Sequence, residues 1–207
     1  LQAEFLRDQA LAASGLLVSK IGGPSVKPYN PPGIYEQVVS AYVPPTYLVG
    51  ARDQLYRRSL YTYWKRSVPN PTMSLFDASF RETCTVRRSR TNTPLQALDL
   101  MNDPTYVEAA RCLAERMVRE GGDSPARRID LGFERVLCRK PHDSELAILM
   151  AAYERTLKEF EKDPDSAAQL IKVGNSVTET VIPPVELAAM TSVASTLLNL
   201  DEAVTKE

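Results

Sequence analysis

Proline follows a helix-capping residue at four places in the second half of the chain, and each place opens a segment with helical periodicity. The pairs are Thr93-Pro94, Asp103-Pro104, Ser124-Pro125 and Asp163-Pro164, and Pro183-Pro184 opens one more such segment. Proline suits the first turn of a helix because its missing N–H would have no partner there, while Thr, Ser and Asp side chains accept hydrogen bonds from the neighbouring N–H groups. These starts predict a bundle of helices over residues 93–207.

The segments after these starts, and a longer one after Pro141, carry apolar residues at the spacing of one helix face. Residues three and four positions apart lie on the same face of a helix, so we expect these side chains to point inward. They are Leu95, Leu98 and Met101; Val107, Ala110, Ala114, Met117 and Val118; Ile129, Phe133, Val136 and Leu137; Leu146, Leu149, Met150, Tyr153, Leu157 and Phe160; and Leu187, Met190, Val193, Ala194, Leu197 and Leu198.

The first half of the chain has a different character. One helix is expected over residues 2–17, with an apolar face that includes Phe5, Leu6, Leu11, Leu16 and Leu17. Prolines then alternate with tyrosines between residues 25 and 50. Proline interrupts both helices and sheets, so this stretch predicts an irregular segment with at most a short helix near residues 34–43.

Residues 55–66 fit neither the helical nor the strand period, and their tyrosine, tryptophan and threonine content favours an extended conformation. Residues 76–90 predict an ordered but irregular loop. The expected fold class is therefore mainly α, in a single domain over residues 1–207. A first helix and an irregular Pro/Tyr- and Arg-rich layer would form residues 1–92, beside the helical bundle of residues 93–207.

Composition excludes several classes of function. The formal net charge is −1, so no global field draws the chain to nucleic acid. No apolar run approaches the ~20 residues that span a bilayer, which leaves at most a peripheral association with a membrane complex. The chain has one histidine and three cysteines with no CxxC spacing, so no metal site, haem attachment or catalytic relay can be assigned. The residues favour a non-catalytic role.

The cysteines and the lone histidine have plainer interpretations. Cys84, Cys112 and Cys138 are expected to be buried small side chains, as free cysteines commonly are. Cys84 is the candidate exception, because nearby arginines would favour its reactive thiolate. His142 stands at a helix start, where a surface or capping role is expected.

An arginine-rich stretch is the richest candidate for a binding site. Its residues are Arg57, Arg58, Tyr61, Trp64, Arg66, Asp77, Arg87, Arg88, Asn92 and Gln96. Guanidinium groups bind carboxylate, sulfate or phosphate through paired hydrogen bonds, so these side chains could bind an anionic ligand or a partner. The plainer interpretation is that they bond to Asp77, Glu82 and the carbonyl groups of an irregular loop. Both interpretations stay open.

Several stretches resemble a known family. They are LRDQALAASGLL at 6–17, KIGGPSVKPYNPPGIYE at 20–36, LYRRSLYTYWKRSVPNPTMSLFDA at 55–78, CTVRRSRTNTPLQALDLMNDPTYVEAARCLAERM at 84–117, LCRKPHDSEL at 137–146 and LLNLDEAVTKE at 197–207. The chain is similar to the C-terminal domain of unknown function of planctomycete-type cytochrome c proteins. It departs from that family at Cys138, where glycine is common, and at His142, where threonine or serine is common.

The resemblance implies a bacterial, periplasmic or otherwise extracytoplasmic location. It also implies a covalent haem in an upstream domain of the parent protein, with no cofactor in this chain. The start at Leu1, without methionine, is consistent with the C-terminal fragment of a larger protein.

We expect an interaction or structural module that acts as an accessory subunit of a cytochrome-linked electron-transfer complex. Its partners would be other domains or subunits of that complex, contacted through its Tyr- and Arg-rich loops. The alternative is a contribution to an enzyme acting on polysaccharide or sulfated glycan, with the arginine-rich stretch binding the anion. The first function predicts that Arg66, Asp77 and Arg88 are paired within the chain, and the second that they converge on an open pocket.

Overall fold

The mainly α prediction is confirmed by the computed structural model, which describes residues 1–35, 47–178 and 181–205 and shows no strand within them. The helices are α1 (Ala3–Ser14), α2 (Pro71–Leu75), α3 (Pro94–Asn102), α4 (Pro104–Glu120), α5 (Pro125–Leu137), α6 (Asp143–Lys162), α7 (Pro164–Leu170), α8 (Pro184–Leu198) and α9 (Asp201–Val204). Two short 3-10 turns, η1 (Arg52–Leu55) and η2 (Ser59–Tyr61), lie in the irregular layer.

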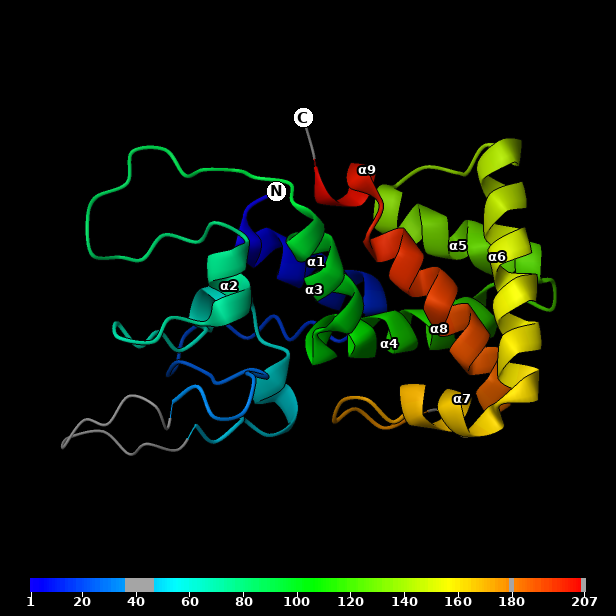
Figure 1. Ribbon diagram of the computed structural model, residues 1–207, viewed down its shortest axis with the longest axis horizontal. Helices are drawn as coiled ribbons and strands as arrows, with labels where there is room; N and C mark the ends of the chain where they lie inside the picture. Colours follow the sequence, from blue (N-terminus) through cyan, green and yellow to red (C-terminus); the bar gives the residue numbers. More distant parts are fainter. Residues whose placement is uncertain (36–46, 179–180, 206–207) are drawn as a thin grey trace.

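Helices α4 and α8 form the centre of the molecule, packed against each other (Figure 1). Helix α8 also contacts α6 and α7, while α1 and α5 pack on α4. Leu187, Met190 and Leu197 of α8 are fully buried, as are Leu113 and Met117 of α4. A helix that is apolar on most sides belongs in the interior, which explains why α8 is covered by its neighbours.

The helices begin at the predicted prolines, and the side chains of Thr93, Asp103 and Asp163 cap them as predicted, whereas the Ser124 side chain makes no cap hydrogen bond. At α3, the Thr93 hydroxyl accepts a hydrogen bond from the Gln96 backbone N–H (3.3 Å), and the Gln96 side-chain oxygen accepts one from the Thr93 N–H (2.9 Å). At α4, an Asp103 carboxylate oxygen accepts from the Thr105 N–H (2.8 Å). These reciprocal bonds satisfy N–H groups that have no partner inside the helix.

One predicted inward face is wrong. Leu95, Leu98 and Met101 of α3 are 59%, 52% and 48% exposed, whereas Gln96 and Leu100 are buried. The physical reason lies in the Gln96 side chain, which donates to the Leu75 carbonyl (2.8 Å) and to the Thr91 hydroxyl (2.9 Å). These bonds turn the Gln96 side of the helix toward the interior of the protein. The leucine stripe is consequently left on the outside.

The first half also departs from expectation. Helix α1 ends at Ser14 because Gly15 takes a left-handed conformation (φ 82°), and Phe5 is 52% exposed rather than buried. Helix α2 was not predicted; it begins because the Asn70 side chain accepts a hydrogen bond from the Met73 N–H (3.0 Å). The expected short helix near 34–43 lies almost wholly outside the described residues.

The stretch expected to be extended, residues 55–66, instead forms η2 and isolated bridges to neighbouring segments. Arg7 of α1 fastens this stretch to the bundle. Its buried guanidinium donates to the carbonyl groups of Leu55 and Arg57 (2.9 Å to the latter) and to the Ser59 hydroxyl (3.2 Å). Backbone carbonyls that lack a ladder partner are thereby satisfied by a side chain.

Cysteine burial was predicted correctly only for Cys112, because Cys84 and Cys138 are exposed. Cys138 ends α5 in the left-handed conformation, with φ 58° and ψ 24°. Glycine takes this conformation without steric cost, whereas a residue with a Cβ is strained there.

We therefore expect Cys138→Gly to raise the free energy of unfolding by about 1 kcal/mol. Urea denaturation followed by circular dichroism measures the change. Cys84→Gly, in the exposed loop, controls for loss of the thiol and should bring no gain. A Cys138→Gly variant that is less stable than the natural chain would contradict the strain at this position.

Candidate functional site

The structure distributes the predicted arginine-rich site over several separate positions. Arg57 is buried and donates to the carbonyl groups of Lys20 (3.0 Å), Gly22 (2.6 Å) and Pro24 (3.2 Å). Its guanidinium carbon also lies 3.9 Å from the centre of the Tyr61 ring. Arg57 and Tyr61 therefore hold a turn of the irregular layer in place.

Three more of the predicted arginines form ion pairs with carboxylates of the same chain. The pairs are Arg58 with Asp8 (3.6 Å), Arg66 with Glu82 (3.3 Å) and Arg88 with Glu4 (2.7 Å). The Arg66 side chain is 82% exposed, so its pair contributes little to stability. Trp64 lies beneath the Arg81 guanidinium, 4.7 Å from the ring centre.

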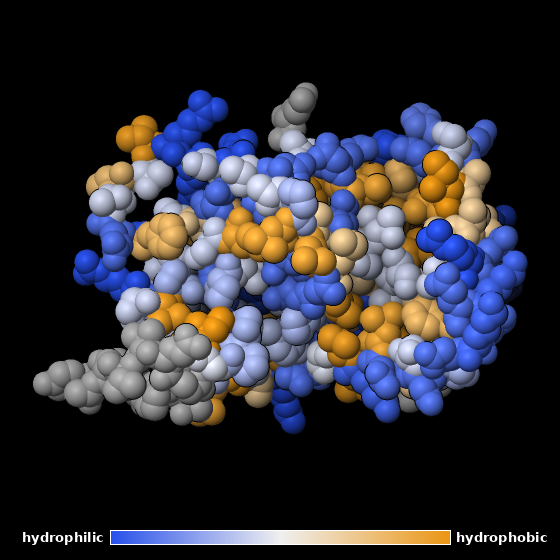
Figure 2. All heavy atoms as spheres, viewed as in Figure 1, coloured by the Kyte–Doolittle hydropathy of each residue, from blue (hydrophilic) through white to orange (hydrophobic). Residues whose placement is uncertain are grey.

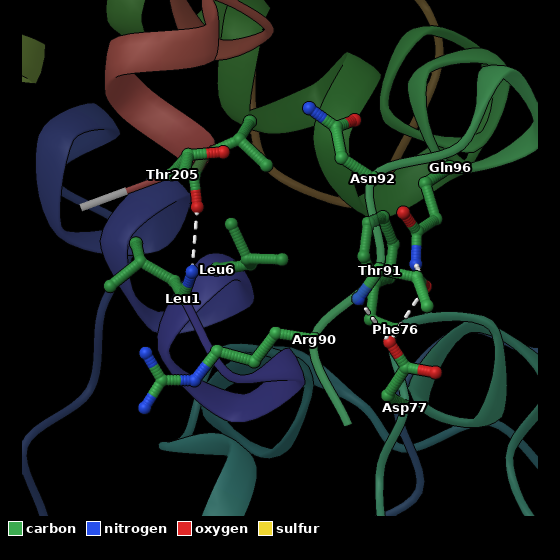
Figure 3. Close-up of a pocket in the computed structure, with 10 residues that line it drawn as sticks. Leu1, Leu6, Phe76, Asp77, Arg90, Thr91, Asn92, Gln96 and Thr205 are labelled. Atoms are coloured by element: carbon green, nitrogen blue, oxygen red, sulfur yellow. Dashed lines mark hydrogen bonds between the residues drawn. The ribbon is translucent and has the colours of Figure 1, made fainter. Parts of the chain in front are cut away.

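Asp77, Asn92 and Gln96 do meet, at a small cavity of about 100 Å³ between the start of α1, the start of α3 and the C-terminal residues (Figure 3). The Asp77 carboxylate accepts from both the N–H and the hydroxyl of Thr91, each at 2.7 Å. The Asn92 amide donates to Asp201 (3.1 Å). The polar groups of this cavity therefore bond mainly to one another.

Arg87 and Arg88 line a different feature, an open hollow of about 370 Å³ that Ser89 and Arg90 complete. It lies on the exposed loop between α2 and α3. The ion-paired Arg88 and the guanidinium groups of Arg87 and Arg90, with no carboxylate among the lining residues, make this concavity cationic.

A buried carboxylate that the sequence did not indicate joins the two halves of the chain. Glu108 of α4 is 1% exposed and accepts hydrogen bonds from the hydroxyls of Tyr29 (2.9 Å) and Tyr56 (2.8 Å). It also accepts from the N–H groups of Asn175 (2.7 Å) and Ser176 (2.6 Å), and from the Ser176 hydroxyl (2.8 Å). Burial, together with the neighbouring carboxylate, raises the pKa of both tyrosines.

Arg111, one turn further along α4, completes this buried cluster. Its guanidinium lies 3.9 Å from Glu108 and 2.5 Å from Glu115, and it donates to the Ser176 carbonyl (3.2 Å). The Cys112 sulfur is 3.3 Å from the Ser176 hydroxyl, and burial raises the pKa of this thiol to about 11. Five donors bond to Glu108, which is 1% exposed, so a substrate cannot reach this carboxylate and we interpret the cluster as structural.

A third feature is an apolar groove of about 470 Å³ between α2 and α3, called the α3 groove below. Its apolar walls are Pro31, Pro71, Leu75, Leu95, Leu98 and Pro104. Figure 2 shows hydrophobic side chains gathered over this part of the surface. Asp99 and Asp103 lie among them, and burial, reinforced by the Asp103 charge, raises the pKa of Asp99 to about 6.

Residues 1–153 match the model of one protein family, described as PSD1, protein of unknown function (DUF1553). The chain belongs to the PSD1 family. The match includes the α3 groove and Glu108, whereas the Ser176 contact lies beyond it. No curated protein and no solved structure matches this PSD1 chain.

The described parts of the PSD1 chain hold no group of three or more His, Cys, Asp and Glu residues placed to bind a metal ion. Across residues 1–35, 47–178 and 181–205, no helix has both the length and the apolar content needed to cross a bilayer. Of the features above, the α3 groove combines open apolar walls with Asp99, whose buried Oδ2 atom has no hydrogen-bond partner within the described part of the chain. It is therefore the candidate site of this PSD1 chain.

Proposed function

We propose that this PSD1 chain is a non-catalytic interaction module that docks another domain or subunit through the α3 groove. The observation that supports this function best is the exposure of two leucines. Leu95 and Leu98 lie side by side on one wall of an apolar concavity, and they are 59% and 52% exposed. The arginine-rich stretch, by comparison, has most of its named side chains engaged within the chain.

The energetics support docking at this place. Covering apolar surface gains roughly 25 cal/mol per Å², so a partner that fills the α3 groove would gain from both leucines. Polar groups at the edge of the groove include Thr72 and Asn102. An apolar centre with a polar rim is the usual anatomy of a protein–protein contact. An open apolar concavity is also a known mark of an interaction surface.

We further propose an extracytoplasmic setting, in which the chain is an accessory module of a cytochrome-linked redox assembly. The support for this setting is the sequence resemblance to planctomycete-type cytochrome c proteins. The haem would be bound covalently by an upstream domain of the parent protein, since this chain has no CxxCH motif. In such an assembly, the PSD1 module would position domains relative to one another.

The double variant Leu95→Ser, Leu98→Ser tests this function. The tagged natural chain, purified from the periplasmic extract of its own bacterium, is expected to bring down a c-type cytochrome, detected by haem peroxidase staining. The double variant should lose at least tenfold of that haem signal, because each leucine contributes about 1 kcal/mol or more of apolar burial. Its thermal unfolding should be unchanged, since both side chains are exposed.

Ile148→Ser provides the matched control, because Ile148 is an exposed apolar residue (69%) on α6, away from the groove. This variant should recover as much cytochrome as the natural chain. Recovery of the natural chain without haem protein would contradict the cytochrome-linked setting. Full recovery by the double variant would contradict docking at the α3 groove.

The second candidate is a contribution to an enzyme acting on polysaccharide or sulfated glycan. The observation in its favour is the cationic hollow lined by Arg87, Arg88 and Arg90. We rank it second because the residues that line this hollow include no carboxylate, whereas glycoside hydrolysis uses a pair. Isothermal titration calorimetry tests this second function. It would be favoured if the chain bound a sulfated oligosaccharide but not the unsulfated one, and if Arg87→Ala abolished the binding.

A further inference from the structure

The α3 groove contains a carboxylate that is only partly satisfied. Asp99 shares one face of α3 with Leu95, Leu98 and Asn102, because these positions are three, four and seven residues apart. Its Oδ2 atom is buried and has no hydrogen-bond partner among the residues that the structure describes. A buried polar atom without a partner costs free energy, so its presence on an otherwise apolar face calls for a ligand that satisfies it.

The groups around Asp99 supply no such partner. Asp103 adds a like charge, and its own oxygens accept hydrogen bonds from the Thr105 N–H (2.8 Å) and the Thr72 hydroxyl (3.1 Å). Tyr106 of α4 is the other titratable group that interacts with Asp99, and α2 carries no ionisable residue. The buried Arg7 of α1 interacts electrostatically with Asp103, but its guanidinium donates to the carbonyl groups of Leu55 and Arg57 and to the Ser59 hydroxyl. Among the described residues that line the groove, Asp99 and Asp103 are the ionisable ones, so its polar part is negative.

We propose that the α3 groove receives a segment of a partner protein in which apolar side chains cover Leu95 and Leu98 and a lysine or arginine pairs with Asp99. This inference rests on the docking function proposed above and specifies the chemistry of the partner. The cation satisfies the buried oxygen and offsets the repulsion between Asp99 and Asp103. Charge-assisted hydrogen bonds of this kind are about twice as strong as neutral ones.

The same charges argue against a second copy of this chain as the occupant. A symmetric dimer through the groove would bring the same patch of both copies together. Each Asp99 would then approach the negative groove of the other copy, and like charges in an apolar contact are costly. A partner with the opposite charge avoids this cost.

The pairing should depend on pH. The pKa of Asp99 in the unbound chain is about 6, raised by burial and then by Asp103. Below that pH the carboxyl is neutral and binds a cation weakly, and above it the carboxylate is present. Affinity for a basic segment should therefore rise between pH 5 and pH 7.5, and the bound cation should lower the pKa of Asp99.

The test uses a phage-displayed library of random 12-residue peptides, selected on the natural chain and depleted on the Leu95→Ser, Leu98→Ser variant. We expect the selected peptides to combine apolar residues with a lysine or arginine. Fluorescence anisotropy at pH 7.5 should show on the order of tenfold weaker binding to Asp99→Asn, as for loss of one charge-assisted hydrogen bond. The variant should also lose the dependence on pH.

Asp123→Asn, at an exposed position in the loop between α4 and α5, is the matched control and should bind like the natural chain. Asp99→Asn should fold at least as well as the natural chain, which thermal unfolding checks, because an amide has no charge to bury. Peptides that need the leucines but show no enrichment in lysine or arginine would overturn this inference and leave the docking function standing.

Two other outcomes would overturn it differently. If no selected peptide depends on Leu95 and Leu98, both the inference and the docking function fail. If sedimentation velocity shows that the natural chain self-associates and that the double leucine variant does not, a second copy occupies the groove and the basic-segment inference fails.

Discussion

Glu108→Gln is expected to lower the free energy of unfolding by about 3 kcal/mol, which is a large part of the stability of a domain this size. Glutamine keeps the shape of the side chain but replaces one acceptor oxygen with an NH₂ donor. The Tyr29 hydroxyl bonds to Oε2, and Tyr56, Asn175 and Ser176 bond to Oε1, so the NH₂ would face donors at whichever oxygen it replaces, and the charge that all of them share would be lost. Arg111, which is 1% exposed, would also lose one of its two carboxylate neighbours.

Urea denaturation followed by circular dichroism measures this loss, and Glu154→Gln on the exposed face of α6 provides the control. In Glu108→Gln, hydrogen exchange should speed up more at residues 174–176 than in α8, because the carboxylate that holds this loop against α4 is lost. A change below 0.5 kcal/mol in Glu108→Gln would show that the cluster does not hold the two halves of the chain together.

Gly174→Ala is expected to cost about 3 kcal/mol, for two separate reasons. Gly174 has a φ of 97°, which residues with a Cβ rarely adopt, and a Cβ placed there would lie 2.2 Å from the Glu108 carboxyl carbon. The loop would have to move away from Glu108, and the hydrogen bonds to Asn175 and Ser176 would be lost with it.

Gly122→Ala separates the two contributions. Gly122 also has a positive φ (79°), but nothing lies within 4 Å of a Cβ built there. Its substitution should therefore cost only the backbone strain, about 1 kcal/mol. Thermal unfolding of the two variants gives the difference. Equal losses in both would contradict the close approach between the 174 loop and Glu108.

The helical half of the fold could be predicted because its signals are local. The capping box of Thr93 and Gln96 and the proline-opened starts act within one turn of the helix that they begin. The stripe of α8 is apolar enough to require burial wherever that helix lies. The same reasoning missed α2, because a five-residue helix with one capping asparagine has too few residues to show a period.

The site was harder to predict, because its residues act over long sequence distances. Glu108 falls in a helix with apolar neighbours at Val107 and Ala110, and a periodic pattern assigns such a glutamate to the solvent. Its partners are the hydroxyl of Tyr29, 79 positions away, and the loop at Ser176, 68 positions away. The prolines and tyrosines of the first half indicated a surface layer but not the atom that anchors it.

The arginine-rich stretch shows the opposite error. Its composition suggested a shared binding surface, but guanidinium groups bind carbonyls and carboxylates of their own chain as readily as those of a ligand. Only the positions of Lys20, Gly22 and Pro24 decide that Arg57 is used internally. Composition shows which hydrogen-bonding side chains are present. Whether each one bonds within the chain or to a ligand depends on the donors and acceptors that lie within about 3 Å of it.

The sequence by itself therefore determined the mainly α class and the places where the helices of the second half begin, since caps, prolines and apolar periodicity act through neighbours in the chain. Tertiary structure decided which face of α3 is exposed, because the Gln96 side chain finds its partners on Leu75 and Thr91. It also decided that Glu108 is buried and that Asp99 lies unpaired in an apolar groove. Burial and pairing depend on segments brought together in space, and no local pattern contains that information.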